Sequence, residues 1–436
     1  SQDVAYRFPT GARPAGSAVW LGVRVTGATE ASGELRLWQE GTGERLYSLR
    51  AERSTKDGAL WLGTETVLPE ENGLVWYYFT LTVAGQTVYY GNNAERLGGV
   101  GKAASEPPPS FQITVYDKEA DTPAWFRRSV IYQIFPDRFC RGGDRLPEKR
   151  RAVLHASWQD APQYYKDEVS GEVLAYDFFG GDLAGIRSRL PYLRDLGISV
   201  VYLNPVFEAE SNHRYDTGDY KKIDPLLGTE EEFRELCQHA RALGIRIILD
   251  GVFSHTGSNS RYFNRRGEYD SVGAYQSPES PYYPWYDFVN YPQEYRSWWG
   301  FATLPNVRET EPSYMDFIIR APDSVLHHWL AAGISGFRLD VIDELPAEFS
   351  QAFYREMKRT DPEAVLIGEI WEDASNKIAY GKQRAYLSGR EIDGAMNYPF
   401  RAATLDFLLG KTEAAEMNRR LESLRENYPA VHFYAM

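Results

Sequence analysis

Cysteine is scarce in this chain, and its scarcity excludes two classes of protein. Among 436 residues there are two cysteines, Cys140 and Cys237, and their spacing matches no metal-binding or redox motif. The sequence therefore predicts no disulfide framework, which is compatible with a reducing compartment. No charged and then apolar leader opens the sequence. We expect a cytoplasmic location, with secretion as the alternative.

Long hydrophobic runs and an excess of positive charge are also missing. No stretch approaches the roughly 20 apolar residues that a membrane span needs. The 48 Lys and Arg residues are outnumbered by 61 Asp and Glu residues, which gives a net charge of −13. Nucleic acids and anionic membrane surfaces require basic patches, so the sequence predicts neither as a partner. A neutral sugar imposes no such demand.

Aromatic residues, by contrast, are abundant. The chain contains 30 Tyr, 21 Phe and 11 Trp, or 14% of all residues. Flat rings with a polar edge suit stacking against the C–H faces of sugar rings, although most of them are expected in the core.

The chain length fits two or three domains, and the pattern changes near residue 120. In residues 1–120, short alternating or aromatic runs such as 19–25, 34–38 and 74–81 are separated by Gly-rich turns. Such runs at regular spacing predict an antiparallel β-sandwich, a carbohydrate-binding-like domain. Prolines at 107–109 and 123 mark the connection to the next domain.

Residues 125–436 show a repeated strand-then-helix pattern. Continuous apolar strands that alternate with amphipathic segments indicate a parallel sheet covered by helices. The sequence therefore predicts a (β/α)8 TIM barrel with about seven of its eight strands present. The expected helices are 183–196, 230–243 and 322–332, and the expected strands are 130–135, 199–203, 246–250, 337–340, 365–369, 392–396 and 431–434.

A long insertion, residues 256–320, separates the third and fourth expected strands. Residues 262–301 alone hold fourteen aromatic side chains. A loop of this length needs a small core of its own, so about two-thirds of these rings are expected to be structural. The others are expected on the C-terminal face of the barrel, where βα loops build active sites.

The most informative motif is residues 336–340, Gly-Phe-Arg-Leu-Asp. In a strand, Arg338 and Asp340 lie on the same face, roughly 6–7 Å apart. A guanidinium that close keeps a carboxylate ionised at neutral pH, as a nucleophile on an acetal carbon requires. Glu369 ends a second apolar strand, and two acids at the ends of neighbouring strands predict glycoside hydrolysis. The Arg-x-Asp motif alone would fit a structural ion pair better than a nucleophile.

Four motifs resemble, in their order along the chain, conserved features of the α-amylase superfamily of retaining glycoside hydrolases. Residues 250–255 (Asp-Gly-Val-Phe-Ser-His), 336–340 and 368–371 (Gly-Glu-Ile-Trp) resemble the first, second and third signatures of that family. Residues 213–220 resemble the loop after its second strand. The similarity covers residues 125–436, and a β-sandwich ahead of the barrel is typical of the neopullulanase, cyclomaltodextrinase and amylopullulanase branch.

The resemblance implies roles for the two acids. It makes Asp340 the nucleophile and Glu369 the general acid/base. The residues themselves agree, because Arg338 is expected to depress the pKa of Asp340, while apolar neighbours are expected to raise that of Glu369. Asp250 is expected to orient Arg338 or the strand end rather than to perform chemistry.

The resemblance also implies contacts with the substrate. In the family, the histidine that matches His255 hydrogen-bonds the sugar being cleaved, and the tyrosine that matches Tyr215 stacks under its ring. Arg338 belongs to the same substrate-binding group. Trp371 resembles a ring on the leaving-group side, and core packing explains that residue equally well.

Calcium is the one metal that the resemblance suggests. The branch binds it through an Asn- and Asp-rich loop after the first strand and through a Gly-Gly-Asp. Here residues 137–144 carry Arg and Gly where oxygen ligands would be expected. Calcium takes six to eight oxygens, and only Asp144, Asp182 and the Gly180 carbonyl qualify. We therefore expect no required cofactor, with calcium at these three residues as the site to test.

The family's fourth signature, a His-Asp pair after the seventh strand, has no counterpart in this sequence, nor do the eighth βα unit and the C-terminal β-domain. In the family, that aspartate holds the sugar in its distorted transition-state shape. We expect a further segment to complete the barrel, and residues 1–436 alone to be poorly soluble or partly unfolded, and catalytically silent even when folded.

The sequence thus predicts a hydrolase that cleaves α-1,4 bonds, and α-1,6 bonds as a second target, in starch-type glucans, pullulan, maltooligosaccharides or cyclodextrins. A transglycosylase on the same scaffold is the first alternative, since water and a sugar hydroxyl compete for one intermediate. A non-catalytic glucan-binding barrel is the second, and the presence of both acids weighs against it. The oligomeric state is left open, a homodimer included.

Overall fold

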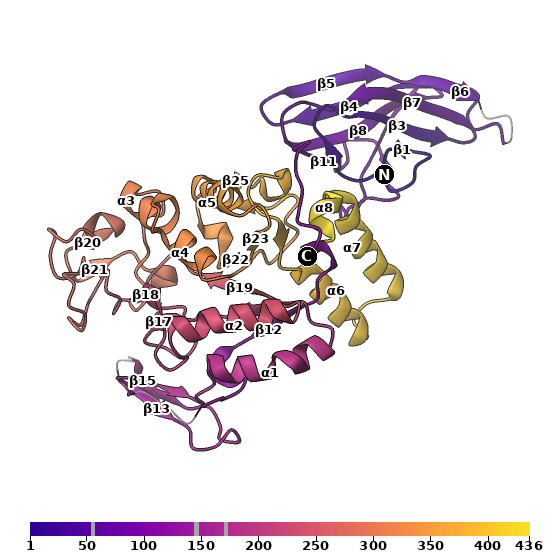
Figure 1. Cartoon of the computed structure of the whole chain (residues 1–436). Coiled ribbons are helices and arrows are strands. Elements are labelled where there is room, and N and C mark those ends of the chain that lie inside the picture. The colour runs from indigo at the N-terminus through magenta and orange to yellow at the C-terminus, as the bar shows by residue number, and fades with distance from the viewer. Residues whose placement is uncertain (54–56, 144–147, 170–172) are drawn as a thin grey trace. The chain divides into compact units, whose positions relative to one another are not determined.

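The computed structural model describes residues 1–53, 57–143, 148–169 and 173–436, and its chain forms two compact units (Figure 1). One unit comprises Pro123–Glu369. The other comprises Ser1–Thr122 together with Ile370–Met436. None of the helices in the described residues combines the length and apolar character that a membrane crossing requires.

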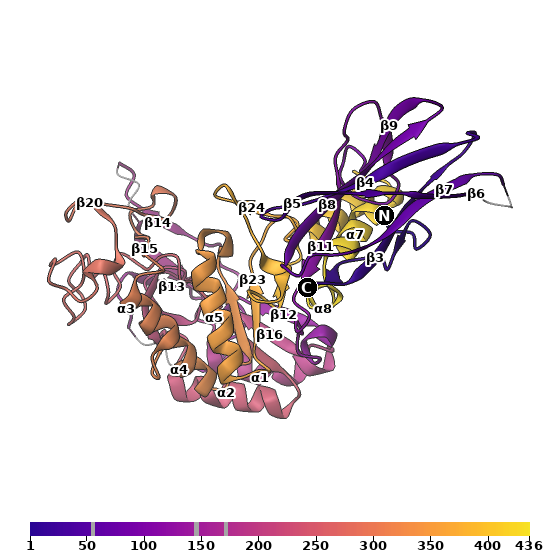
Figure 2. The same ribbon diagram turned by 90° about the horizontal axis from the view of Figure 1, so that it is seen from above.

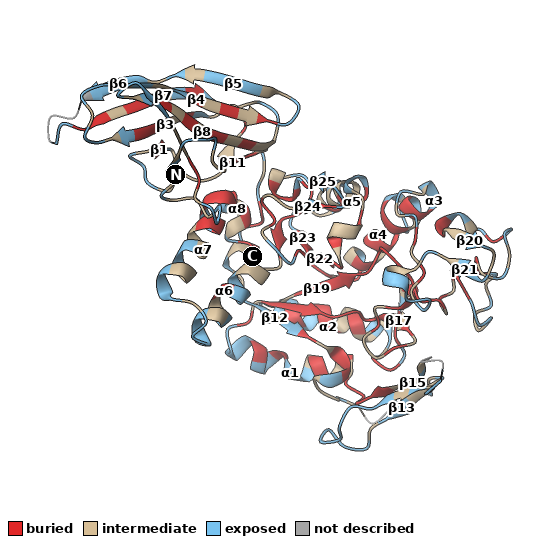
Figure 3. Ribbon diagram, turned by 180° about the vertical axis from the view of Figure 1, so that it is seen from behind, coloured by how far each residue is buried: buried red, intermediate tan, exposed pale blue. Residues whose placement is uncertain are grey.

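Parallel strands form the centre of the unit Pro123–Glu369. They lie in the order β12 (Ile131–Ile134), β16 (Val200–Leu203), β19 (Arg246–Gly251), β22 (Gly336–Leu339) and β23 (Val365–Gly368). Every residue of β16, β22 and β23 is buried, as expected for apolar strands that are covered on both faces (Figure 3). The first five predicted barrel strands are therefore confirmed.

The helices between these strands include the three that the sequence predicts, with ends that differ by at most three residues, and a fourth helix, Ala347–Thr360. They are α1 (Leu183–Asp195), α2 (Glu230–Ala242), α4 (Val325–Ala331) and α5 (Ala347–Thr360). Helix α2 starts with a capping box in which Thr229 and Glu232 satisfy each other's backbone N–H groups. Helices α1 and α2 pack against each other, as do α4 and α5 (Figure 2).

Two small β-structures follow strands β12 and β16, before the long insertion. A small sheet of β13 (Ala152–Leu154), β15 (Val173–Phe178) and β14 (Tyr164–Lys166) lies between β12 and α1. A hairpin of β17 (Phe207–Ala209) and β18 (Thr217–Ile223) follows β16.

The insertion 256–320 has little regular structure and a core of its own. Its elements are the short helices η3 (Tyr283–Trp285), η4 (Trp298–Gly300), α3 (Pro312–Met315) and η5 (Asp316–Arg320) and the strands β20 (Phe288–Asn290) and β21 (Glu294–Tyr295). The rings of Tyr262, Phe263, Trp285 and Tyr286 are buried. These four agree with the expectation that many rings of the insertion form its core. Trp299, which is 70% exposed, and Phe301 face solvent.

The first 122 residues form a sandwich of two antiparallel-dominated sheets, as predicted. One sheet has the order β1 (Arg7–Phe8), β3 (Ala18–Val25), β7 (Leu60–Val67) and β6 (Arg50–Arg53). The other has the order β10 (Lys102–Ala104), β9 (Gln86–Gly91), β8 (Gly73–Val83), β11 (Phe111–Tyr116) and β2 (Arg13–Pro14), and β4 (Ala31–Gln39) pairs with both β8 and β5 (Gly43–Ser48). Every second residue of β8 from Val75 to Leu81 points into the core, the alternation expected of a half-buried strand.

Residues 370–436 pack in the same unit as this sandwich. They contain β24 (Ile378–Ala379), β25 (Lys382–Gln383), η7 (Tyr386–Ser388), β26 (Gly394–Ala395), α6 (Tyr398–Leu408), α7 (Ala414–Asn427) and α8 (Ala430–Phe433). Arg7 of the sandwich is fully buried and lies 3.0 Å from Glu426 of α7. The predicted division at 120 and 125, with a catalytic domain up to 436, stays a prediction, because compactness assigns residues 370–436 to the other unit.

The seventh predicted strand, residues 431–434, is wrong. Residues Ala430–Phe433 form helix α8, which follows Pro429. His432 of this helix is buried, and its Nδ1 lies 2.9 Å from the Asp393 carbonyl oxygen. The alternation of apolar and polar residues over four positions was too short to distinguish a strand from one helical turn.

Candidate active site

Polar side chains at the ends of three neighbouring parallel strands converge. The pairing of β19 with β22 puts Asp250 beside Arg338. The pairing of β22 with β23 leaves Asp340 and Glu369 as the next residues on two adjacent strands. Since the strands are parallel, their carboxyl ends lie at one edge of the sheet, where active sites of such folds form.

Arg338 joins the three carboxylates. Its Nη1 donates to Asp250 Oδ1 and to Asp340 Oδ1, both at 2.8 Å, and its Nη2 lies 2.9 Å from Glu369 Oε2. No more than 10% of any of these four side chains is exposed. The predicted pairing of Arg338 with Asp340 is confirmed, and the same guanidinium also binds Glu369, for which the sequence predicted apolar surroundings.

Asp340 differs from its sequence-based expectation in its protonation. Burial raises the pKa of Asp340 to about 8, against the opposing pull of Arg338 and with added repulsion from Asp250 and Glu369. The predicted depression of this pKa is therefore wrong. One guanidinium faces three carboxylates, and desolvation penalises every ionised form among them.

The second oxygen of Asp250 is bound by two tyrosines. Tyr202 and Tyr215 both donate their hydroxyl hydrogen to Oδ2, the latter at 3.0 Å. The amide of Asn204 in turn donates to the Tyr215 hydroxyl at 2.9 Å. Asp250 thus orients Arg338, as expected, and also fixes the hydroxyl of Tyr215. Tyr202 and Asn204 were missed from the sequence, where the available signal was a polar side chain at the end of an apolar strand.

His255 lies directly after β19, as the motif indicates. It is 2% exposed, and burial lowers its pKa to about 4, so the imidazole is neutral at neutral pH. Its Nε2 lies 3.1 Å from the Tyr215 carbonyl oxygen and its Nδ1 lies 2.9 Å from the Ser254 hydroxyl. The structure therefore brings His255, Tyr215, Arg338, Asp340 and, through Arg338, Glu369 into one connected group.

The backbone turn after Asp340 is strained. Val341 has a φ of 38° and a ψ of 53°, a left-handed conformation that is rare for a β-branched residue. In that conformation its N–H donates to Glu369 Oε2 at 2.8 Å. Strain of this kind persists where the surrounding structure enforces it, and it is frequent at active sites.

Three tryptophans of the insertion and Trp371 lie in different environments. Trp285 is 3% exposed and its Nε1 donates to Ser313 Oγ, so it is a core residue. The ring of Trp298 lies 5.5 Å from that of His255, and Trp299 donates from Nε1 to Glu344 Oε1 at 2.8 Å. Trp371 is 53% exposed and belongs to the other unit, so its role near the leaving group stays a prediction.

The residues expected to bind calcium do not fit that ion. Asp144 lies outside the described residues. Arg141 donates to the Gly180 carbonyl at 3.3 Å and to the Phe179 carbonyl at 3.2 Å, so a guanidinium occupies the position beside these oxygens. Both carboxylate oxygens of Asp182 accept backbone N–H groups, and one of them caps helix α1.

Other metal sites are equally unsupported in the described part of the chain, where no group of three or more His, Cys, Asp or Glu side chains is placed to hold an ion.

Comparison with known proteins adds independent findings. The model of the alpha amylase catalytic domain matches residues 133–432. An amylopullulanase of Thermoanaerobacter thermohydrosulfuricus is 38% identical over all of this chain and 32% of its own length. Neopullulanase 2 of Thermoactinomyces vulgaris is 32% identical over 84% of this chain and 58% of its own length.

A solved structure agrees with these relatives. The cyclic alpha-maltosyl-(1→6)-maltose hydrolase of Arthrobacter globiformis superposes with a TM-score of 0.61 at 30% identity, over 72% of this chain and 65% of that one. The chain spans about a third of the length of the amylopullulanases that it matches.

Proposed function

The chain belongs to the alpha-amylase family, and from that premise we propose that it supplies the catalytic acids of a retaining glycoside hydrolase. Its substrates are starch-type glucans, pullulan, maltooligosaccharides or cyclodextrins, cleaved at α-1,4 bonds with α-1,6 bonds as a second target. The observation on which the proposal rests is the single guanidinium of Arg338 that binds both Asp340 and Glu369.

In the proposed mechanism Asp340 attacks the anomeric carbon of the sugar and forms a covalent glycosyl-enzyme. Glu369 donates a proton to the departing glycosidic oxygen, and later takes one from the water that releases the sugar. Arg338 bridges the two groups, which favours the short carboxyl separation, roughly 5 Å, of retaining enzymes. Net retention of anomeric configuration follows from two displacements at the same carbon.

The charge of the cluster supports this division of labour. Asp250, Asp340 and Glu369 together carry three negative charges when ionised, and Arg338 supplies one positive charge. The raised pKa of Asp340 means that the cluster keeps a proton at neutral pH. A proton held by strongly coupled groups belongs to the cluster as a whole. Catalysis requires the arrangement in which that proton lies on Glu369 and Asp340 is ionised.

The neighbouring side chains are proposed to hold the sugar. A ring stacked on Tyr215 would lie close to Asp340, because the hydroxyl of Tyr215 is fixed on Asp250. Neutral His255 is able to donate a hydrogen bond to a sugar hydroxyl once its contact with the Tyr215 carbonyl opens. We also propose a cytoplasmic location, supported by the two unpaired cysteines, Cys140 and Cys237.

The test is to incubate the whole protein with pullulan and to identify the products. Panose or maltotriose is expected, with the anomeric configuration of the new reducing end retained when it is followed by NMR. The Asp340→Asn variant should lose turnover while glucan binding largely survives, since an amide keeps the shape but forms no covalent intermediate. Cleavage by that variant at a near-normal rate would refute the assignment.

A further inference from the structure

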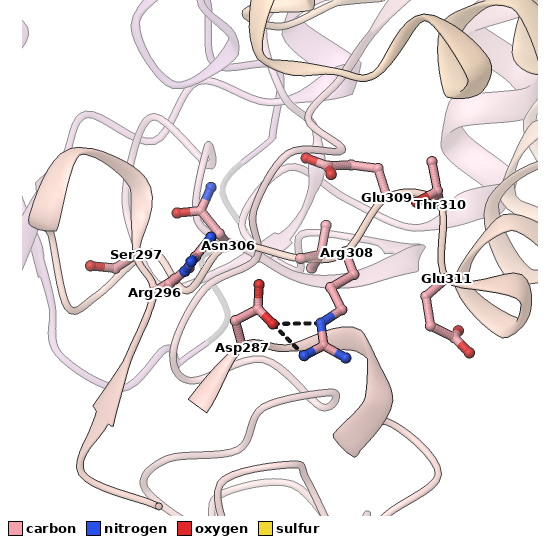
Figure 4. A pocket seen from close by; sticks show the side chains of 9 residues that line it. Asp287, Arg296, Ser297, Asn306, Arg308, Glu309, Thr310 and Glu311 are labelled. Carbon is pink, nitrogen blue, oxygen red and sulfur yellow. Dashed lines mark hydrogen bonds and ion pairs between the residues drawn. The ribbon is translucent and has the colours of Figure 1, made fainter. Parts of the chain in front are cut away.

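A polar cavity of about 630 Å³ lies within the insertion, apart from the Arg338 cluster (Figure 4). Two short stretches, 296–297 and 306–311, form most of its wall, together with Asp287. Val307 is the one apolar residue of this lining. A cavity of this size and polarity is large enough for a sugar unit and offers hydrogen-bonding groups on several sides.

The wall of this cavity is joined to the backbone that carries His255. Asn306 stands opposite His255 in an antiparallel bridge, and the Val307 N–H donates to the Ser254 carbonyl at 3.1 Å. Residues paired in this way lie roughly 5 Å apart. The cavity therefore begins within about one sugar length of a side chain of the candidate active site.

Several of the charged side chains around the cavity already have a partner within the protein. Arg308 donates to Asp287 from Nε, and Figure 4 shows the side chain of Glu309 pointing away from this pair. Glu311 accepts the Tyr314 N–H at 2.9 Å at the start of α3. Across the described residues, no Lys, Arg or His forms an ion pair with Glu309.

Glu309 is consequently a carboxyl group without a counterion in a partly closed site. Burial, followed by repulsion from Glu344 and Asp287, raises its pKa to about 8. At neutral pH the group is protonated, so it has one donor and one accepting oxygen. That combination matches a sugar hydroxyl, which also donates and accepts, and it matches neither an anion nor a cation.

Aromatic rings lie between this cavity and His255. Ser297 lines the cavity, and the next residue is Trp298, whose ring neighbours that of His255. Trp299, at a φ of 50°, is largely exposed and is held by Glu344. Exposed rings beside polar side chains are suited to a sugar, which has apolar faces and a polar rim.

We infer that this cavity binds a glucosyl unit of the substrate away from the bond being cleaved, and that Glu309 makes the enzyme prefer longer glucans. The inference rests on the proposed function for its substrate class. It adds a binding position and a residue that determines chain-length preference.

The test compares Glu309→Leu and Glu309→Gln with Glu294→Gln in the whole protein. Glu294 is an exposed residue of β21 in the same insertion, which makes it a matched control. We measure kcat/KM for maltoheptaose and for maltotriose and take their ratio. Glu309→Leu should lower the ratio about tenfold, the effect of one lost hydrogen bond to a half-buried carboxyl group. Glu294→Gln should leave it unchanged.

The pH dependence separates a hydrogen-bonding role from a structural one. In the wild type the ratio should fall above about pH 8, because the ionised Glu309 no longer donates. Glu309→Gln, which always donates, should keep its ratio constant through that range. An unchanged ratio in Glu309→Leu, or equal losses on both substrates together with a lower Tm, would overturn the inference.

Binding without turnover distinguishes this inference from the proposed function. Calorimetry in an Asp340→Asn background gives the affinity for maltoheptaose with and without Glu309→Leu. Weaker binding in the double variant supports the cavity even if the wild type cleaves no glucan. Equal binding overturns the cavity even if cleavage is normal.

Discussion

Replacing Asp250 with Asn tests whether the Arg338 cluster shares one proton. Asp250 and Asp340 both accept from Arg338 Nη1 at 2.8 Å. Two oxygens around one nitrogen lie roughly 5 Å apart, and unit charges at that separation interact by about 3 kcal/mol at an effective dielectric constant near 20. Removing the charge of Asp250 therefore favours ionisation of its neighbour by about two pKa units.

The sign of the shift follows from the raised pKa of Asp340. The wild-type cluster should lose its last proton near pH 8, and with it the acid needed for departure of the leaving group. In Asp250→Asn the proton should leave near about pH 6, so the basic limb of the kcat/KM profile moves to lower pH. The rate at the optimum should also fall, because Tyr215 and Arg338 lose a charged partner.

The assay is kcat/KM for maltotriose, whose sugar leaving group requires protonation, between pH 4 and about 10, because this ratio reports the ionisation of the free enzyme. Tyr202→Phe is the matched control, since it removes one hydrogen bond to the same carboxylate and no charge. Its basic limb should stay where that of the wild type is. A limb that does not move in Asp250→Asn, or moves to higher pH, would refute the shared-proton account.

Four further substitutions test the acid, the aromatic insertion and the Gly180 loop. Glu369→Gln should slow substrates with poor leaving groups far more than those whose leaving group needs no protonation, and equal slowing of aryl glucosides of both kinds would argue against its role as the acid. Trp299→Ala should raise KM on long glucans more than it lowers kcat on short ones, whereas Trp285→Ala should cost about 3–5 kcal/mol of stability, as measured by chemical denaturation. Arg141→Met should lower Tm because it leaves two carbonyls without a donor, and a chelator should leave the Tm of the wild type unchanged. A chelator effect larger than that of Arg141→Met would show that calcium, rather than the guanidinium, holds this loop.

The strand ends could be predicted from the sequence because each signal is local. Continuous apolar runs mark buried parallel strands, and parallel strands bring their carboxyl ends to one edge. Arg338 and Asp340 are two residues apart in one strand, so their shared face follows from the period of the strand alone. The order of the motifs along the chain was then enough to predict that Asp340, Glu369 and His255 lie at the same edge.

The contacts between strands could not be predicted in the same way. That Glu369 binds Arg338 depends on the register of β23 against β22. That Tyr202 binds Asp250 depends on the register of β16 against β19. A shift of one residue in either pairing would turn these side chains to the opposite face of the sheet.

The pKa of Asp340 was mispredicted for a related reason. Its sequence neighbour Arg338 lowers the pKa, and that neighbour was visible in the motif. The opposing effects, burial and the charges of Asp250 and Glu369, come from other strands. Because desolvation of a carboxylate is not a pairwise contact, no motif contains it.

The protonation and the orientation of each acid in the cluster depend on the other two acids. Burial raises the pKa of Asp340 and Arg338 opposes it, while the charges of Asp250 and Glu369 raise it further, so that the cluster keeps a proton at neutral pH. Asp250 performs no bond-making step, yet its charge raises the pKa of its neighbour, and its second oxygen holds Tyr215 in place. The strained N–H of Val341 donates to Glu369 Oε2, which Arg338 Nη2 also contacts at 2.9 Å, so this oxygen of the acid is held in a fixed position. The sheet edge thus brings a nucleophile, a shared proton and an oriented acid together around one guanidinium.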